Sequence, residues 1–351
     1  MVNDFLSARK ILIRFPNWVG DIVMTLPALQ ALRISMPDAH FVAMVRSEYL
    51  DFTRRIAAVN ELVEAPSLSG PNRARNWWQS VQQLRRQDIQ GAVLFATSFE
   101  SAFTIWSAGI PVRVGYATDW RSALLTHKVS LEDVHHRAKS FCRLAETVGA
   151  VENSEAPPFL FQAAEQQYVD QLFKRLGLNS KVPPIFVNPA AAKTARSWSS
   201  RRFEEMVDRI ANEQGVPIFV HARHPFVPTE GWPKNPEVHL IQDVTLVQLS
   251  ALIGRCCLYV GNDSGPMHIA AALGIPSIGI YGPSHPDYTS PHEVTGGSHL
   301  AISGFLECSP CRERFFEDCP EPPSADGRPP CLDRVSVETV VQHVHSVLYR
   351  S

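Results

Sequence analysis

Short apolar runs alternate with helical patterns in the first part of the chain. Apolar residues dominate positions 11–15, 41–45 and 92–96, and each run has the length of one buried strand. Stretches such as 77–86 lie between these runs and show helical spacing of their apolar positions. Because parallel strands joined by crossover helices produce this alternation, the pattern predicts an α/β domain.

A second series of the same kind follows a polar interruption. Residues 151–162 contain Glu, Asn, Ser and a Pro-Pro pair, a composition that favours a linker. Strands are then predicted at 185–187, 218–220, 258–260 and 277–281, and helices at 202–214, 246–253, 267–273 and 335–348. We therefore predict an N-terminal domain over 1–160, a C-terminal domain over 161–334 and a C-terminal helix over 335–351. Since ligands bind beyond the carboxyl ends of parallel strands, two facing domains should share one cleft lined by the loops described next.

The first candidate site lies where the first strand gives way to a helix. Residues 16–21 form a predicted loop, and a helical pattern continues to Arg33. Gly20 would let the backbone approach a ligand closely, and the helix N-terminus favours negative charge. Asp21 is either a catalytic base or a helix N-cap, and capping is the commoner role of an aspartate in this position.

Two later loops carry the other candidates. Residues 188–198, NPAAAKTARSW, lie between a strand and a helix, and Lys193 and Arg196 there would meet a diphosphate or remain solvated charges of an ordinary loop. Residues 261–268, GNDSGPMH, combine polar groups and glycines at a strand end, where backbone N–H groups of the next helix point at an anion. The candidates in this second loop are Asp263, Ser264, Gly265 and His268; a lone histidine such as His268 is more often a structural residue than a phosphate ligand.

Composition limits the possible functions. The 351 residues are 45% hydrophobic, enough for two cores and too apolar for disorder. A formal net charge of -2 gives no general basic field, so we expect no nucleic-acid partner. The N-terminus lacks a secretion pattern and no long apolar run occurs, so a cytoplasmic location is expected. Neither a three-glycine dinucleotide fingerprint nor a Walker phosphate loop is present, which weakens hydride transfer and ATP hydrolysis as functions.

Three further features leave alternatives open. Cys308, Cys311, Cys319 and Cys331 form either a structural zinc site or a set of reduced thiols, because only the first pair has finger-like spacing. Residues 72–86 mix tryptophans with arginines, which is typical of a membrane-surface contact but also of core tryptophans beside solvated arginines. Arg46, Arg113 and Arg121 are weaker candidates for binding acidic groups of an acceptor.

Four segments in this order resemble glycosyltransferase family 9, the heptosyltransferases, and in particular the heptosyltransferase II type. They are RFPNWVGDIVMTLPAL, FATSFESAFTIWSAGIPVRVGY, the loop ending in ARSW, and GNDSGPMHIAAALGIPSIGIYGPSHP. The resemblance runs through most of the chain. It implies a GT-B fold, in which two Rossmann-like domains face a central cleft, the first binding a lipopolysaccharide core acceptor of the heptosyl-Kdo-lipid A type and the second an ADP-heptose donor.

The resemblance also implies roles for the candidate residues. The resemblance implies a reaction that inverts the anomeric carbon without a required metal or cofactor. Asp21 matches the general base of the family, which favours the catalytic interpretation of this residue over capping. Lys193, Arg196 and the Ser264–Gly265 turn would stabilise the leaving ADP, and Asp263 would hold sugar hydroxyls. A lipid-anchored acceptor further implies peripheral contact with the inner membrane.

Two departures from the family pattern keep other functions open. Arg196 stands where the family usually has lysine, and the segment HARHPFVPTEG lacks the glutamate expected for ribose, with Glu230 as a weak substitute. The alternatives are a family 9 transferase with a different nucleotide sugar or acceptor, and a nucleotide-sugar-binding protein without turnover. A nicotinamide-dependent oxidoreductase is a third, disfavoured by the missing glycine fingerprint.

Overall fold

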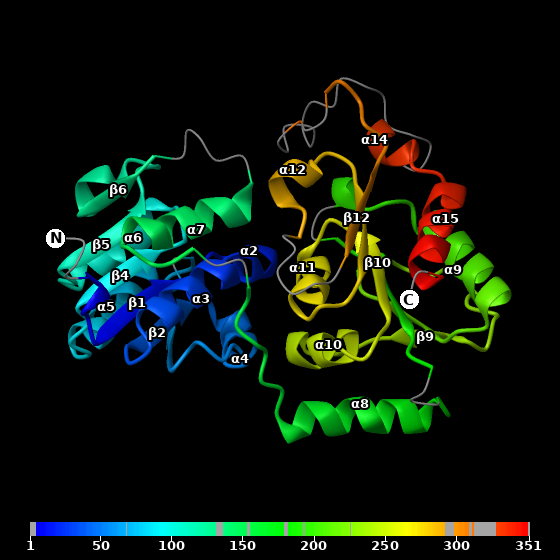
Figure 1. Ribbon diagram of the computed structural model, residues 1–351, viewed down its shortest axis with the longest axis horizontal. Coiled ribbons are helices and arrows are strands. Elements are labelled where there is room, and N and C mark those ends of the chain that lie inside the picture. The colour runs from blue at the N-terminus through cyan, green and yellow to red at the C-terminus, as the bar shows by residue number, and fades with distance from the viewer. Residues whose placement is uncertain are drawn as a thin grey trace. The chain divides into compact units, whose positions relative to one another are not determined.

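The structure is a computed structural model in which the chain divides into two compact units, Met1–Leu160 and Phe161–Ser351. It describes residues 5–67, 69–130, 136–152, 155–178, 182–191, 194–224, 226–291, 298–308, 311 and 328–349. Figure 1 shows strands and helices alternating through both units. The α/β class predicted from the sequence is confirmed.

Unit 1 is built on a six-stranded parallel sheet with the order β3-β2-β1-β4-β5-β6. Its strands are β1 (Lys10–Arg14), β2 (His40–Val45), β3 (Glu61–Glu64), β4 (Gly91–Leu94), β5 (Val112–Tyr116) and β6 (His127–Val129). Its helices are α2 (Val19–Met24), α3 (Leu26–Ser35), α4 (Leu50–Thr53), α5 (Arg73–Arg85), α6 (Phe99–Ser107) and α7 (Arg137–Thr147), with short 3-10 turns at Ser47–Tyr49 and Arg121–Leu124.

The central strands of unit 1 are buried on both sides. All residues of β4, and all but the first of β1 and β2, are buried, which explains why these strands appear in the sequence as continuous apolar runs. Helices α3 and α7 pack against each other, and so do α5 and α6. The layer under α5 and α6 includes Leu12, Val42, Leu84 and Ile105.

Unit 2 repeats the plan with the order β12-β11-β10-β7-β8-β9, again all parallel. Its strands are β7 (Ile185–Asn188), β8 (Ile218–His221), β9 (Val238–Ile241), β10 (Leu258–Asn262), β11 (Ser277–Tyr281) and β12 (His299–Ser303). Its helices are α8 (Ala163–Arg175), α9 (Ser200–Gln214), α10 (Leu246–Ile253), α11 (Gly265–Ala272), α12 (Pro286–Thr289), α14 (Pro330–Asp333) and α15 (Val337–Leu348), with a 3-10 turn at Thr194–Arg196.

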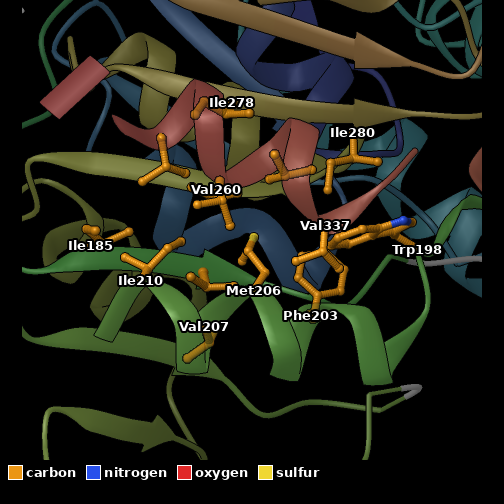
Figure 2. Close-up of a cluster of buried hydrophobic side chains, with 14 of the residues drawn as sticks. Ile185, Trp198, Phe203, Met206, Val207, Ile210, Val260, Ile278, Ile280 and Val337 are labelled. Carbon is orange, nitrogen blue, oxygen red and sulfur yellow. The ribbon is translucent and has the colours of Figure 1, made fainter. Parts of the chain in front are cut away.

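One hydrophobic cluster joins the last helix to the sheet of unit 2. In Figure 2, Phe203, Met206 and Ile210 of α9 lie beside sheet residues such as Val260, and Val337 of α15 joins the same cluster. The cluster also contains Val340, which has no solvent exposure. The C-terminal helix is therefore part of the core of unit 2.

The strongly apolar strands were predicted to within a few residues, whereas the first helix was not. The predicted helix to Arg33 is two helices, because Pro27 lies in the first turn of α3 and a new helix starts after Thr25. The strands β3, β5, β6, β9 and β12 escaped prediction because they are only partly buried and carry polar residues among the apolar ones. Within the described residues, no helix is both long and apolar enough to cross a bilayer.

Candidate active site

Each sheet has one position where the strand order reverses. In unit 1 this switch point lies between β1 and β4, and in unit 2 between β7 and β10. The loops leaving such neighbouring strands run in opposite directions, which opens a crevice at the carboxyl ends of the strands where ligands bind in sheets of this kind. Three of the sequence candidate segments follow β1, β7 and β10, so all of them lie at the two switch points.

In unit 1, Arg14 fixes the loop that follows β1. This arginine is 6% exposed, donates a hydrogen bond from Nη2 to Oδ1 of Asn17 at 2.8 Å, and also donates to the carbonyl of Phe15. Burial, the neighbouring Arg46 and, in the opposite sense, Glu100 bring the pKa of Arg14 to about 10, so it stays charged at neutral pH. The loop is thereby tied down just before Gly20 and Asp21.

Asp21 is not a helix cap. The N-cap of α2 is Trp18, Gly20 is the second helical residue and Asp21 the third, so the capping interpretation is wrong. The Asp21 carboxylate instead pairs with the guanidinium of Arg137 at the start of α7, with Nε to Oδ1 at 3.1 Å and Nη2 to Oδ2 at 3.3 Å. The Asp21 side chain keeps 15% of its surface exposed and that of Arg137 keeps 51%.

Two of the three weaker candidate arginines serve the fold. Arg121 has no exposed surface and donates to the carbonyls of Tyr116 at 2.8 Å and Ala96 at 2.5 Å. Arg113 donates to the carbonyls of Leu124 at 2.6 Å and Ile110 at 2.5 Å. Both guanidinium groups are engaged with backbone oxygens, which leaves Arg121 no surface for an acceptor, while acceptor binding by the partly exposed Arg113 stays a prediction; Arg46 is half-exposed and pairs with Glu48 at 3.1 Å.

In unit 2, two buried asparagines at strand ends hold the loop between β7 and α9. Asn188 ends β7 and donates from Nδ2 to the Ala190 carbonyl at 2.8 Å and to Oγ of Ser264 at 3.1 Å. Asn262 ends β10, donates from Nδ2 to the Pro189 carbonyl at 2.7 Å and accepts the backbone N–H of Trp198 at 2.8 Å. Both ends of the loop are thus bonded to the switch point.

This anchoring brings together candidates from two loops that lie far apart in the sequence. Nη1 of Arg196 lies 3.9 Å from Oδ2 of Asp263, and Nε2 of His268 lies 3.9 Å from Oδ1 of the same carboxylate. Thr289 of α12 donates its hydroxyl to Oδ2 of Asp263 at 3.4 Å. Both 3.9 Å separations are longer than a hydrogen bond, and the Arg196 contact is at ion-pair distance.

Burial sets the electrostatics of this cluster. Asp263 is 5% exposed, and burial raises its pKa, while the nearby Ser284 hydroxyl and the charge of Arg196 oppose that rise. His268 is 4% exposed and is the fourth residue of α11, near the start of that helix as the sequence suggested, and its contact with a phosphate stays a prediction. Arg196 keeps 26% of its side chain exposed.

The turn into α11 lies beside the cluster. Ser264 is the N-cap residue of α11 and Gly265 is its first residue, but the Ser264 side chain makes no capping bond to the helix, and its hydroxyl accepts from Asn188. A helix N-terminus without a side-chain cap favours an anionic ligand through its dipole and its N–H groups. Lys193, the other cation predicted for this region, lies outside the described residues.

Sequence reasoning missed three contributors to these sites. Arg137 gave no local signal, because it is 116 residues from Asp21. His221 ends β8, and its Nδ1 hydrogen-bonds Oδ1 of Asn188 at 2.9 Å; burial and the nearby Arg223 lower its pKa to about 4, so it is neutral. Asn188 is a polar residue at the end of an apolar strand, and this pattern could have predicted its place in the site.

Gly261 serves packing between strands. A Cβ at this position would lie 2.8 Å from the backbone oxygen of Asn188 and 2.7 Å from the hydroxyl of Tyr259. Because the first of these contacts is with backbone, a side chain would push β10 away from β7 at the switch point. The glycine that opens the GNDSG motif therefore keeps the two asparagine-bearing strands together.

The remaining sequence candidates add little to the site. Cys308 is a free thiol, and Cys319 lies outside the described residues, as does Pro225 of the HARHPFVPTEG segment. Considering the described part of the chain alone, no three His, Cys, Asp or Glu side chains are grouped as metal ligands. Glu230 is exposed in the loop after β8.

Comparison with known proteins relates this site to one enzyme family. The sequence model of glycosyltransferase family 9 (heptosyltransferase) matches residues 77–318. Lipopolysaccharide heptosyltransferase 2 of Escherichia coli strain K12 is 28% identical over 303 residues, which cover 80% of this chain and 85% of that protein.

Two solved structures share the fold through almost the whole chain. The family 9 glycosyltransferase of Veillonella parvula has a TM-score of 0.83 at 19% identity and covers 98% of both chains. The ADP-heptose heptosyltransferase II of E. coli has a TM-score of 0.77 at 23% identity, covering 97% of this chain and 99% of that one. The GT-B fold expected from the sequence is confirmed as two Rossmann-like units, and the shared cleft stays a prediction. Because the family model matches well over half of the residues, the chain belongs to glycosyltransferase family 9, a family of sugar-transferring enzymes.

Proposed function

We propose that this enzyme transfers heptose from ADP-heptose to the inner core of lipopolysaccharide with inversion at the anomeric carbon. The family and the names of the related E. coli proteins, which specify heptosyltransferase, lipopolysaccharide and ADP-heptose, support this donor and acceptor. The observation that carries the proposal is the cluster of Arg196, Asp263 and His268 at the switch point of unit 2. It combines a partly exposed cation with a buried carboxylate, the two kinds of group that an ADP-sugar needs.

Unit 2 is the proposed donor-binding unit. The diphosphate would lie at the N-terminus of α11, where the Ser264–Gly265 turn supplies N–H groups and Arg196 supplies the opposite charge. Lys193, in the same loop, would add a second cation. Asp263, buried and acceptor-rich, would receive hydrogen bonds from sugar hydroxyls, and His268 would hold the far oxygen of that carboxylate.

Unit 1 is the proposed acceptor-binding unit, with Asp21 as general base. Arg137 grips both oxygens of Asp21, which leaves the carboxylate oriented and still partly open to solvent. As the acceptor hydroxyl oxygen forms its bond to the anomeric carbon, its proton passes to Asp21. The carbon–oxygen bond to the diphosphate breaks with its electron pair on ADP, and the cations of unit 2 stabilise the added charge.

A transfer assay with purified protein tests this function. Heptosyl-Kdo-lipid A, or its deacylated form, is incubated with ADP-heptose and, separately, with UDP- and GDP-sugars, and the product is measured by mass spectrometry. We expect transfer from ADP-heptose, with the opposite anomeric configuration in the product. Transfer only from another nucleotide sugar would identify a different family 9 transferase, and tight ADP binding without any transfer would identify a binding protein.

A further inference from the structure

Unit 1 exposes a set of large aromatic side chains that the proposed catalysis does not use. Trp78 on α5, Phe99 and Trp106 on α6, and Trp120 in the turn after β5 are 50%, 40%, 47% and 93% exposed. Three of the seven tryptophans of the chain are therefore in this set. We call these four residues the aromatic surface. Exposing apolar rings to water costs free energy, so a group of exposed rings indicates a surface that binds another molecule.

Ring contacts join most of this surface to the core of unit 1. Phe103 stacks with Trp77 at 5.3 Å, with Phe99 at 5.8 Å and with Trp106 at 5.9 Å between ring centroids. Trp77 packs on the buried cluster under α5 and α6, and its ring lies 6.2 Å from that of Trp78. The exposed rings on the two helices are thus one connected layer held in place from beneath.

The turn that carries Trp120 is held in an unusual backbone conformation. Asp119 and Trp120 both have positive φ angles, 50° and 59°, which non-glycine residues seldom adopt. Oδ2 of Asp119 accepts the backbone N–H of Phe99 at 2.7 Å, which anchors the turn to the start of α6. The strain is maintained while the Trp120 ring remains almost fully in solvent.

Positive charge is concentrated on α5, the helix that carries Trp78. Arg73, Arg75 and Arg85 lie on α5 and Arg86 follows it, and residues 73–86 contain no acidic side chain. The guanidinium carbon of Arg85 is 5.7 Å from the Trp78 ring centroid, and its Nη2 donates to the Ser107 carbonyl of α6 at 2.8 Å. The acidic residues nearest in sequence are Asp88, after α5, Glu100, which follows Phe99 on α6, and Asp119, which precedes Trp120.

We propose that the aromatic surface and the arginines of α5 bind the face of an anionic lipid bilayer. Tryptophan and phenylalanine settle at the boundary between headgroups and acyl chains, while neighbouring arginines pair with anionic headgroups. Single-stranded nucleic acid would need open ring faces for its bases, whereas Phe103 and its neighbours already stack on one another. The inference rests on the proposed function in one respect, which is that a lipid A anchor would bring the acceptor to the same bilayer.

Flotation with lipid vesicles tests the surface without any sugar substrate. Full-length protein is mixed with vesicles of phosphatidylethanolamine and phosphatidylglycerol, or of phosphatidylcholine alone. We expect retention on the anionic vesicles that weakens in high salt. Arg75→Glu should lower the partition coefficient about 30-fold by reversing a charge near the surface. The double variant Trp78→Ala/Trp106→Ala should lower it on the order of tenfold or more by removing inserted ring area.

The matched control is Arg175→Glu, which makes the same charge change on the exposed end of α8 in unit 2 and should bind vesicles as the unaltered protein does. Thermal unfolding shows whether each variant folds. The proposal is overturned if the unaltered protein does not float with anionic vesicles, or if Arg75→Glu floats equally well. It is also overturned if these substitutions abolish binding of a uridine oligonucleotide while vesicle binding is absent.

A transfer assay separates this inference from the proposed function. The variants should transfer heptose to a deacylated, water-soluble acceptor at the normal rate and lose transfer only to acceptor in vesicles. If vesicle binding follows the expected pattern while no acceptor of either form is modified, the proposed function fails and the lipid-binding surface stands.

Discussion

The two units share one strand order but differ in what lies at their switch points. In unit 1 the central group is Asp21, which is partly open to solvent and paired through its side chain with Arg137. In unit 2 Asn188, Asn262 and Asp263 are all buried and bonded into the sheet or the adjoining loops. The same strand order thus carries an accessible carboxylate in unit 1 and a buried polar network in unit 2.

Because of this difference, the two sites should contribute unequally to the stability of the fold. A partly exposed carboxylate with one ionic partner contributes little to folding, because solvent screens such a pair and water can replace it. A buried network contributes more, because each lost bond leaves a polar atom without water. Substitutions in the site of unit 1 should therefore change turnover, whereas those in unit 2 should change donor affinity, stability or both.

The largest effect is expected for Asp21→Asn. The amide keeps the shape of the carboxylate but cannot accept the acceptor proton, so kcat should fall on the order of 10³-fold. ADP binding, measured by calorimetry, and thermal stability should stay unchanged, since the residue lies in unit 1. Asp51→Asn, at an exposed carboxylate of α4 in the same unit, is the control. Equal losses of ADP affinity and turnover in Asp21→Asn would contradict a role as base.

The next effect concerns the pH dependence of stability in unit 2. Burial, with a smaller contribution from Arg223, lowers the pKa of His221 from 6.5 to about 4 in the folded protein. As the pH falls from 6.5 towards 4, the unfolded chain gains a proton that the folded chain does not take. Stability should therefore fall across this window by roughly 3 kcal/mol from this residue, and this contribution should level off below pH 4.

Urea unfolding between pH 7 and pH 4 measures this slope. His221→Gln should remove part of it, while the exposed control His224→Gln should leave it unchanged. A portion should remain in His221→Gln, because burial and, secondarily, His268 also lower the pKa of His299 to about 4. An unaltered slope in His221→Gln would show that the imidazole is not held neutral in the network.

A smaller effect is expected for Arg196→Ala. Loss of a charge-assisted contact with the diphosphate should weaken ADP-sugar binding about 20-fold, and slow departure of ADP should lower kcat as well. Arg196→Lys should recover much of the affinity, since the charge remains although the planar fork is lost. Arg202, in the same loop-helix region, pairs with Asp333 at 2.6 Å, so Arg202→Ala tests whether any lost arginine there has the same effect. Donor affinity that is equal in Arg196→Ala and the unaltered enzyme would remove Arg196 from the donor site.

The smallest effect is expected for Arg137→Lys. A lysine keeps the charge near Asp21 but contacts only one carboxylate oxygen, so kcat should fall about fivefold while donor KM stays constant. The kcat of Arg137→Ala should be lower still. In the Asp21→Asn background neither substitution should change kcat further, because the carboxylate to be oriented is gone. Additive losses in the double variant would mean that Arg137 acts independently of Asp21.

The motifs and the central strands could be predicted because their signals are local. Residues 258–260 and 277–281 are apolar runs buried on both faces, and the polar loop after each strand directly marks the ligand-binding edge. Asp21, Arg196 and Asp263 were all chosen on this basis. The exposed Trp78 was interpreted more readily as a core residue, since helical spacing alone does not say which side of the helix meets the sheet.

By itself the sequence determined two α/β units, their central strands and the loops that carry the candidate chemistry, because hydrophobic period and turn composition act over a few residues. Only the tertiary structure decided that Arg137 pairs with Asp21 and that Asn188 and Asn262 hydrogen-bond the loop bearing Arg196. It also decided that the Arg121 guanidinium hydrogen-bonds backbone carbonyls. Each of these contacts joins residues brought together by strand order. The type of a residue sets its charge and its capacity for hydrogen bonds. Its partner depends on which segments the fold places next to it.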